Sequence, residues 1–458
     1  MEKAVKLPSS QYLLDTSKEY ALYVCSNRAI PNVTDGLKDG QRKMIWLIKN
    51  KSDKIKTVSL AGESISSGLY LHGDKSASDT ISLLAAPYTN NIPLLEGIGN
   101  FGTRIAPVDG IGAPRYTYVR KNNTTNKLLF QDLDIVPLKD NYDGSTKEPI
   151  TFLPIIPTIL LNGVSGIAVG WSTDILPRTL NDIIDATLAA IDGKKIKKLI
   201  PTYDYLDLNV VELEDGAWEF TGKVDILNTS EILITELTPD ITLEKFKKRL
   251  MQYEDDGKIS DWTDRSTDKI KIEIKFKRGA LKGWTEEKAI EFFKLKTRKT
   301  ERIVVIDWSN EAIRQYDKAE DLVKDFIEWR FGYYITRYQK LLTDTNYKLK
   351  YWLGIKACFD ANLPDQLLSK KDKAEIKKAI ETITKSVGLD DDQIEKIASL
   401  PTYRWAKDFY KHCVDRIKEL KALQKEYKEL LADHDKIKEI FKDEVKALKK
   451  EKFNNGRE

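Results

Sequence analysis

Two runs of apolar residues in the last third of the chain have the period of a coiled coil. In residues 327–345 and again in residues 417–441, the apolar side chains alternate steps of three and four. A long helix with such a stripe must bury it against another helix. The pattern therefore predicts an antiparallel coiled-coil arm formed by residues 319–356 and 405–447.

The segment between the two runs, residues 357–404, carries its own turn signals at Leu363-Pro364-Asp365 and at Leu400-Pro401. We expect a small helical domain there, at the tip of the arm. The Lys- and Glu-rich end of the chain, residues 442–458, includes a tail over 448–458 and is expected to fray.

The remaining sequence predicts an α+β, multidomain protein. At 458 residues the chain is too long for one core, and we expect about three domains. Residues 1–20 have the character of an N-terminal arm. Residues 21–144 contain two helix–turn–helix patterns, a shape that enters a DNA groove. Residues 145–318 mix turns with alternating strands such as 270–276.

Composition excludes some classes of protein and leaves nucleic-acid binding open. Lys and Arg number 75 against 71 Asp and Glu, so a DNA-binding chain of this kind must gather its basic residues on one face. The three cysteines form no CxxC pair, which gives no readable zinc site or disulfide framework and fits a reducing cytoplasm. The longest apolar stretch, residues 153–169, is interrupted by Pro and Gly. We expect buried core there and no membrane span.

Short motifs with possible chemistry follow one another from about residue 20 to about residue 445. A glycine-rich loop ends in the pair Arg115-Tyr116, and Tyr118 follows on the same short predicted strand, 115–120. The other motifs are Asn27-Arg28-Ala29-Ile30-Pro31-Asn32-Val33-Thr34-Asp35-Gly36-Leu37-Lys38, His72-Gly73-Asp74, Gly97-Ile98-Gly99-Asn100-Phe101-Gly102, Asp140-Asn141-Tyr142-Asp143-Gly144 and Asn162-Gly163-Val164-Ser165-Gly166-Ile167.

In this order the motifs resemble those of the gyrase A and topoisomerase IV C subunits, the DNA-breaking subunits of type IIA DNA topoisomerases. Among these the short chain looks most like the medium subunit of tailed-phage enzymes. The resemblance implies a winged-helix cleavage domain over 21–144, an α/β tower domain over 145–318 and a dimer gate in residues 357–404.

The resemblance also implies that Tyr116 is the nucleophile that breaks DNA. A phosphotyrosine keeps the energy of the phosphodiester, because the freed DNA hydroxyl can attack it again. A free tyrosine has a pKa near 10 and needs help to ionise, and Arg115 would stabilise the charge that develops on the phosphorus. The family pattern places Arg28 and His72 around the same phosphate.

Four further residues fall where the family contacts DNA. Lys38 and Arg42 match backbone contacts, which fix position rather than sequence. Ile167 matches an apolar side chain that wedges between base steps and bends the duplex. Lys75 occupies the position of a small hydroxyl residue near the DNA.

The chain departs from the bacterial pattern close to the candidate site. Tyr70 stands in place of one of two histidines, and Gln41 and Asp39 replace a histidine and a proline beside Lys38. These changes leave the division of acid and base work around His72 open.

Motifs for nucleotide and metal binding are missing from the sequence. It has no glycine-rich phosphate loop and no Glu-Gly-Asp with Asp-x-Asp cluster for catalytic Mg²⁺. The resemblance places ATP and Mg²⁺ on a partner, gyrase B-like subunit. We expect double-stranded DNA as substrate, a homodimer within a heterotetramer or larger assembly, and a bacterial or phage-infected cytoplasm. Without a DNA-wrapping β-propeller, relaxation and decatenation are expected rather than supercoiling.

Two other functions are open at this point. A non-catalytic DNA-binding scaffold would keep the helix–turn–helix and the coiled coil, but the intact Arg115-Tyr116 pair argues against it. A tyrosine recombinase would carry its nucleophile late in the chain, whereas Tyr116 comes early. Each residue also has a plainer interpretation: a strand tyrosine, a turn histidine, surface cations or, for Ile167, core.

Lys75 generates a prediction on inhibitors. The residue type that commonly helps to bind quinolones at this position is small and carries a hydroxyl, and Lys75 supplies neither property. We expect weak quinolone inhibition in a DNA-relaxation assay, and a normal inhibition curve at low drug concentration would contradict this.

Overall fold

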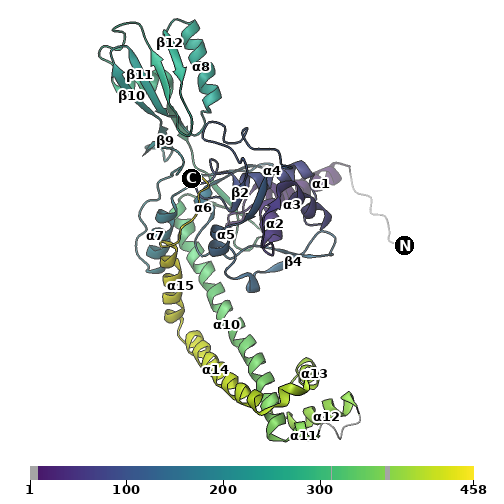
Figure 1. Cartoon of the computed structure of the whole chain (residues 1–458). Helices are drawn as coiled ribbons and strands as arrows, with labels where there is room; N and C mark the ends of the chain where they lie inside the picture. The colour runs from purple at the N-terminus through teal and green to yellow at the C-terminus, as the bar shows by residue number, and fades with distance from the viewer. Residues whose placement is uncertain (1–8, 311, 367–371, 458) are drawn as a thin grey trace. The chain divides into compact units, whose positions relative to one another are not determined.

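The computed structural model describes residues 9–310, 312–366 and 372–457 (Figure 1). The chain divides into two compact units. The first comprises residues up to 330 together with 442–458, and the second comprises residues 331–441. The mixture of helices and strands confirms the predicted α+β, multidomain class.

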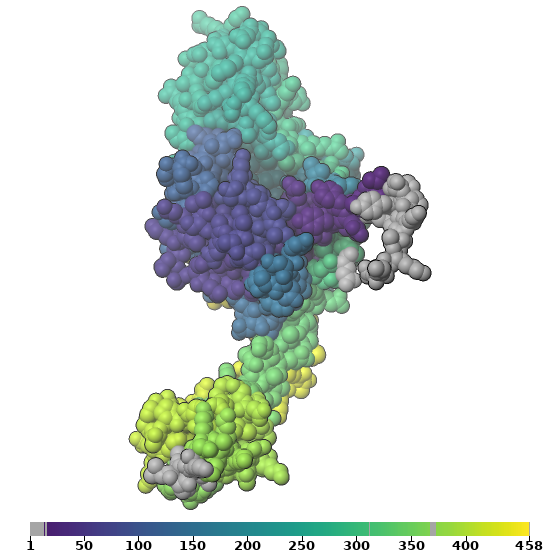
Figure 2. Space-filling view, turned by 90° about the vertical axis from the view of Figure 1, so that its right-hand side faces the viewer, coloured from purple at the N-terminus to yellow at the C-terminus, as the bar shows by residue number. Residues whose placement is uncertain are grey.

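Helices and one small sheet form the N-terminal part of the first unit. Helices α3 and α4 pack against each other and α2 packs on both, while the sheet has the antiparallel order β1-β3-β2. In Figure 2 this purple and blue part presents one continuous face. Its elements are α1 (Ser9–Val24), a π-helical turn η1 (Cys25–Ala29), α2 (Asp39–Ile48), β1 (Ile55–Lys56), α3 (Thr57–Ser66), α4 (Asp74–Ala85), β2 (Leu95–Ile98), β3 (Tyr118–Lys121) and α5 (Asn123–Leu128).

Two expectations for this part need correction. The arm predicted over residues 1–20 is helical in its described part, because α1 begins at Ser9 and continues to Val24. The strand predicted over 115–120 begins only at Tyr118. The Tyr116 amide bonds to the Ala113 carbonyl at 2.9 Å and closes a turn with Pro114 in its second position, where the fixed φ of proline is favourable.

The apolar run predicted as core is buried in its first half and exposed at its end. Phe152 to Leu161 are buried among the helices of the first unit. The chain then reverses at Gly163 and forms a two-stranded hairpin whose turn end is exposed. The elements from here are η2 (Leu133–Ile135), β4 (Leu138–Asp140), β5 (Lys147–Pro149), α6 (Ile159–Asn162), β6 (Val164–Ile167), β7 (Ser172–Ile175) and α7 (Leu180–Ile191).

A four-stranded antiparallel sheet, in the order β10-β11-β13-β12, lies in the middle of the sequence. Ile232 and Ile234 alternate on one face with Ile272 and Ile274, and this face shares a core with α8 and α9. The predicted alternating strands are therefore confirmed. The elements are β8 (Asn209–Glu212), β9 (Trp218–Thr221), β10 (Lys223–Asn228), β11 (Glu231–Glu236), α8 (Leu243–Asp255), β12 (Asp261–Asp264), β13 (Ile272–Lys275), α9 (Glu286–Phe293), β14 (Lys296–Lys299), β15 (Ile303–Ile306) and β16 (Ile313–Tyr316).

Helices α10 (Ala319–Asp360) and α14 (Lys407–Ala432) run antiparallel in the second unit (Figure 1). Tyr338 contacts Tyr427 with ring centroids 6.0 Å apart, and further along α10 the Trp352 carbonyl lies 3.3 Å from the sulfur of Cys413. Residues later in α10 therefore contact residues earlier in α14, which is the antiparallel arrangement that the heptads predict.

The second heptad run is not one helix. It is interrupted at Asp433, whose extended backbone separates α14 from α15 (His434–Leu448). Aspartate has a low helix propensity and its neighbours His434 and Asp435 are also weak helix formers, so a sequence of heptad positions alone overestimates helix continuity here.

The segment between α10 and α14 consists of short helices. Its helices are α11 (Leu363–Gln366), α12 (Lys373–Ile383), α13 (Asp391–Ala398) and η4 (Thr402–Trp405), and residues 367–371 lie outside the described part. Ile380 and Ile397 share one core with Ile355 of α10 and Cys413 of α14. The segment is therefore continuous with the helices that carry it.

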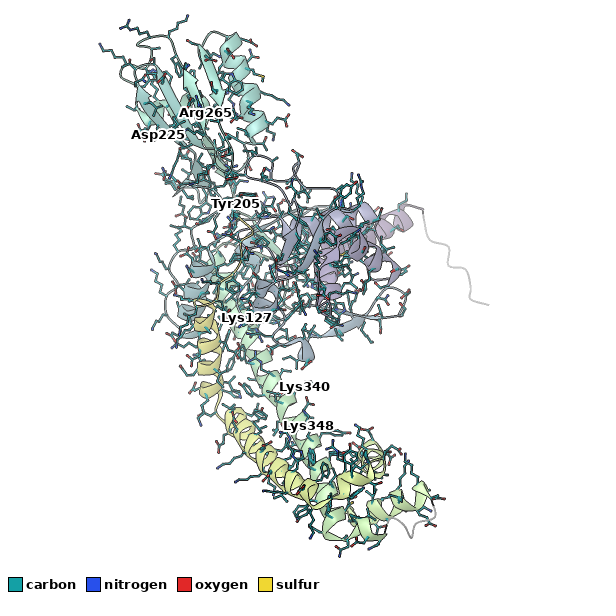
Figure 3. All side chains as sticks on the ribbon, in the orientation of Figure 1. Lys127, Tyr205, Asp225, Arg265, Lys340 and Lys348 are labelled. Carbon is teal, nitrogen blue, oxygen red and sulfur yellow. The ribbon has the colours of Figure 1, made fainter. Side chains whose placement is uncertain are left out.

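The C-terminal tail is held against the first unit rather than frayed. Lys127 pairs with Glu451 at 2.7 Å. The Arg457 guanidinium donates to the Asn91 carbonyl and lies 5.6 Å from the ring of Tyr205, and Lys127 and Tyr205 are both labelled in Figure 3. The expectation of a frayed tail is wrong because these long-range contacts are not visible in a Lys/Glu-rich sequence.

A buried ion pair anchors α10 at Arg330 and gives a stability prediction. Arg330 is fully buried, donates to the Pro154 carbonyl at 2.9 Å and pairs with Asp132. Arg330→Met leaves that carboxylate buried without its cation and should lower the free energy of unfolding by about 3–5 kcal/mol, measured by urea unfolding. As control, Arg265→Met breaks the exposed pair with Glu273 and should cost no more than about 1 kcal/mol. Equal losses in the two variants would contradict the assignment.

Candidate functional site

Asp35 organises the turn that precedes α2. Its carboxylate is buried and accepts bonds from Arg42 Nε at 2.6 Å, Arg42 Nη2 at 2.8 Å, the Leu37 amide at 3.0 Å and the Phe152 amide at 2.9 Å. Burying a carboxylate costs little only when its oxygens are this fully bonded. The same residue therefore fixes the turn, the helix and the apolar run that begins at Phe152.

Arg42 belongs to this support and not to the surface. It is 3% exposed, and burial alone would lower its pKa, but the contacts with Asp35 and the nearby Asp39 and Glu148 outweigh burial and raise the pKa. The position of its guanidinium does not support the expectation that Arg42 contacts the DNA backbone. The sequence alone suggests a solvent-exposed arginine near the start of a helix, because its acceptor, Asp35, lies on the other side of a turn.

Lys38 stands at the N-terminus of α2 and reaches into the hairpin that carries Ile167. Its amide donates to the Gln41 side chain at 3.0 Å, so Gln41 closes the helix start where the family pattern has a histidine. Its ammonium donates to the Ser165 carbonyl at 2.7 Å. Burial lowers the pKa of Lys38, which makes its proton easier to remove than that of a surface lysine.

A cleft of about 830 Å³ brings three of the predicted site residues together. Arg28 from the π-helical turn, Lys38 from the start of α2 and His72 from the loop before α4 all line it. The His72 ring packs edge-on against Tyr70 with centroids 5.2 Å apart, and the Tyr70 hydroxyl bonds to Ser76 at 2.8 Å. Tyr70, in place of a second histidine, thus orients His72.

Tyr116 lies outside this cleft, at the tip of a turn that is fixed on both sides. The Pro114 carbonyl accepts from the Val58 amide at 3.2 Å, and the buried hydroxyl of Thr117 lies 2.9 Å from that of Thr57. Tyr116 itself is 69% exposed, and the Arg115 guanidinium lies 4.6 Å from its ring centroid. The phenol is therefore presented to solvent on a rigid support beside a cation.

The structure distinguishes Tyr116 from Tyr118 by their surroundings. In the sequence, only the Arg115-Tyr116 motif distinguishes them. Tyr118 is half-buried in β3, paired with Lys56 and Ile98, and the ammonium groups of Lys54 and Lys56 lie over its ring. Only Tyr116 of the two is free to approach a macromolecule.

The glycine-rich loop before the turn needs its glycines for close packing. Gly102 has φ of +94°, and a Cβ there would lie 2.2 Å from the Pro107 carbonyl oxygen. The loop is tied to the turn that carries Tyr116, because the Gly112 amide bonds to the Asn100 carbonyl at 2.9 Å. The loop therefore sets where Arg115 and Tyr116 emerge.

The remaining predicted DNA contacts, Ile167 and Lys75, are both exposed. Ile167 is 87% exposed at the end of β6, which excludes the plain core interpretation of this residue. Lys75 lies in the first turn of α4 and does not line the cleft.

Sequence reasoning missed two residues here. Asp35 and Tyr142 both lie in motifs that carry the resemblance, yet neither received a role. Tyr142 is 87% exposed, lines the cleft and sits on the β4–β5 hairpin, which Asn141 ties to the Gly68 carbonyl at 3.2 Å. The exposure of Tyr142 on a fixed hairpin marks it as a candidate site residue, and only the structure shows this exposure.

The described residues offer no cluster of three or more His, Cys, Asp or Glu side chains arranged to hold a metal ion. Within the same residues, no helix has the length and apolar character needed to cross a membrane.

Comparisons with known proteins agree with this geometry. The model of the DNA gyrase/topoisomerase IV A-subunit family matches residues 28–446. The DNA topoisomerase medium subunit of Enterobacteria phage T4 is 34% identical over 336 residues, which cover 71% of this chain and 74% of that protein.

Eukaryotic proteins and a solved structure are also similar. DNA topoisomerase 2-alpha of Homo sapiens is 32% identical over 348 residues, covering 71% of this chain and 22% of that protein, so the matched part spans about a fifth of the relative. The solved DNA-binding, cleavage and re-ligation domain of Plasmodium falciparum topoisomerase II shares the fold. Its TM-score is 0.80 at 23% identity, with 96% of this chain and 65% of that chain covered.

The contrast between Arg42 and Arg28 is testable with matched substitutions. Arg28→Gln removes an exposed cation from the cleft and should make the dependence of log K on log[salt] for duplex DNA shallower by about 0.9. Arg42→Gln should leave that slope unchanged and instead lower the free energy of unfolding by about 3 kcal/mol. Fluorescence anisotropy over a salt series measures the first effect and urea unfolding the second. A shallower slope in Arg42→Gln would restore Arg42 as a DNA contact.

Proposed function

The chain belongs to the DNA gyrase/topoisomerase IV A-subunit family, the DNA cleavage and religation part of type IIA topoisomerases, and we propose that Tyr116 is its nucleophile. The observation that carries the proposal is the exposed phenol on a turn fixed by Thr57 and Val58, with Arg115 against its ring. A structural tyrosine would be packed, as Tyr118 is.

The proposed reaction is a reversible phosphoryl transfer. The Tyr116 oxygen attacks the scissile phosphorus, the bond from phosphorus to the 3′ oxygen breaks, and the DNA keeps a 5′-phosphotyrosyl link to the protein. The freed 3′-hydroxyl later attacks the same phosphorus and expels the phenolate. Arg115 stabilises the charge on the phosphorus as it develops.

We propose that each active site is shared between two copies of the chain. Arg28 and His72 line one cleft that neither Arg115 nor Tyr116 lines, although these four residues are expected at one phosphate. Two strands require two tyrosines and hence a symmetric dimer. Tyr116 of one copy entering the cleft of the other accounts for both facts.

ATP and Mg²⁺ are assigned to a partner, gyrase B-like subunit. The family pattern places the Glu-Gly-Asp and Asp-x-Asp carboxylates for Mg²⁺ on that partner, and the sequence of this chain carries no such cluster. In a heterotetramer or larger assembly, in a bacterial or phage-infected cytoplasm, the double-strand break lets a second duplex pass, and DNA is relaxed or decatenated.

The parts of the fold take matching roles in this proposal. Residues 21–144 act as the winged-helix cleavage domain, 145–318 as the tower, and 357–404 as the dimer gate at the end of the arm. The chain divides into compact units after residues 330 and 441, so the boundary between the cleavage domain and the tower is a proposal. Lys38, Lys75 and Ile167 are proposed DNA contacts, with Ile167 as the wedge.

Tyr116→Phe tests the nucleophile. The chain is mixed with end-labelled duplex and with its Mg²⁺-binding partner, then denatured with detergent. The wild type should yield protein attached to DNA 5′ ends, and Tyr116→Phe should yield none, because the attacking oxygen is gone. Tyr118→Phe is the matched control and should retain the adduct.

The alternative outcome also has a clear meaning. If the wild type binds DNA but forms no adduct, the chain is a scaffold rather than an enzyme. An adduct lost in Tyr118→Phe and kept in Tyr116→Phe would move the nucleophile to β3.

A further inference from the structure

The hairpin that carries Ile167 displays more apolar surface than one wedge requires. Val169 is 56% exposed and Trp171 is 43% exposed, within four residues of Ile167 at 87%. Grouped exposed apolar side chains of this size mark an interaction surface. Trp171 has no role in the proposed reaction.

The hairpin is rigid, so this display is not the result of a loose loop. The Ala168 amide bonds to the Trp171 carbonyl at 2.8 Å, and Gly170 closes the two-residue turn with φ of +78°, a conformation that favours glycine. On its inner side Ala168 packs on a buried cluster that includes Ile30 and Val304.

Arg302 stands beside this hairpin at a fixed position. Its main chain exchanges two hydrogen bonds with Asp174 of β7, at 2.9 and 3.0 Å, and its guanidinium donates to the Ser172 hydroxyl. Arg302 is exposed, and its guanidinium interacts electrostatically with the Asp174 carboxylate. Arg302, Trp171 and Ile167 together line a shallow cavity of about 440 Å³.

An aromatic face next to an exposed guanidinium fits the wall of a DNA groove. That wall alternates apolar deoxyribose with anionic phosphate, and arginine binds phosphate through its planar fork. Resting on the proposed function, in which Ile167 wedges between base steps, the neighbours of Ile167 must meet the groove wall.

We propose that Trp171 and Arg302 form a DNA contact beside the wedge, in which Trp171 packs on a deoxyribose and Arg302 binds a backbone phosphate. The contact is independent of base sequence. It holds the bent duplex beside Ile167, at the end of the hairpin that lies next to β7 and β15.

Binding of the full chain to a fluorescein-labelled duplex over a salt series tests this. Trp171→Ala should weaken binding about tenfold with an unchanged salt slope, because the lost contact is apolar. Arg302→Gln should make the slope shallower by about 0.9, because one phosphate contact is lost. Trp171→Phe and Arg302→Lys should recover most of each effect.

Matched controls come from the second unit. Tyr403→Ala removes an exposed aromatic residue and Arg416→Gln an exposed arginine, and both should bind as the wild type. An affinity within twofold of wild type in Trp171→Ala, or an unchanged slope in Arg302→Gln, would overturn the proposal. So would normal DNA binding combined with weaker binding of the gyrase B-like partner, which would make the surface a protein interface.

The adduct assay separates this proposal from the proposed function. If the wild type forms the Tyr116 adduct while the hairpin variants bind DNA normally, the function stands and this contact fails. If the wild type shows the predicted binding pattern without any adduct, the contact stands and the proposed nucleophile fails.

Discussion

The buried carboxylate of Asp35 is the interaction on which the arrangement of the first unit depends. It accepts bonds from two nitrogens of Arg42 and from two main-chain amides, one at Leu37 and one at Phe152. Its own carbonyl accepts from Thr158 at 2.9 Å. One side chain thereby joins the turn before α2 to the apolar run that leads into the β6–β7 hairpin, and satisfying the carboxylate requires all of these segments at once.

The same contacts position the cleft together with the hairpin that carries Ile167. Lys38 follows directly on this turn, lines the cleft, and bonds the Ser165 carbonyl in the hairpin of Ile167. Tyr116 is positioned by a separate set of contacts, through Thr57 and the glycine-rich loop. In the proposed function these are two halves of one site, and a second copy brings a tyrosine to each cleft.

The sequence predicted features that depend on period and motif order. The heptads anticipated α10 and the helical segment at 357–404, and strict alternation anticipated β11 and β13, because these patterns are local. The features it missed depend on partners far along the chain. Arg42 is buried in its pair with Asp35, whose carboxylate also accepts from the distant Phe152 amide. The tail is held by Lys127 and Asn91, and Arg302 lines the same cavity as Trp171 although more than a hundred residues separate them. No local pattern encodes such pairings, and the interruption at Asp433 shows that even a clear period does not fix helix ends.

A mixed dimer tests most directly whether each active site is completed by two copies of the chain. One copy carries Tyr116→Phe and the other carries Arg28→Gln with His72→Ala, and neither homodimer should form the covalent adduct. If Tyr116 acts in the cleft of the opposite copy, the mixed dimer contains one intact site and should cut one strand, giving about half the wild-type adduct per dimer. If no adduct forms in the mixed dimer while each copy still binds DNA, tyrosine and cleft belong to the same chain and the shared-site account is wrong.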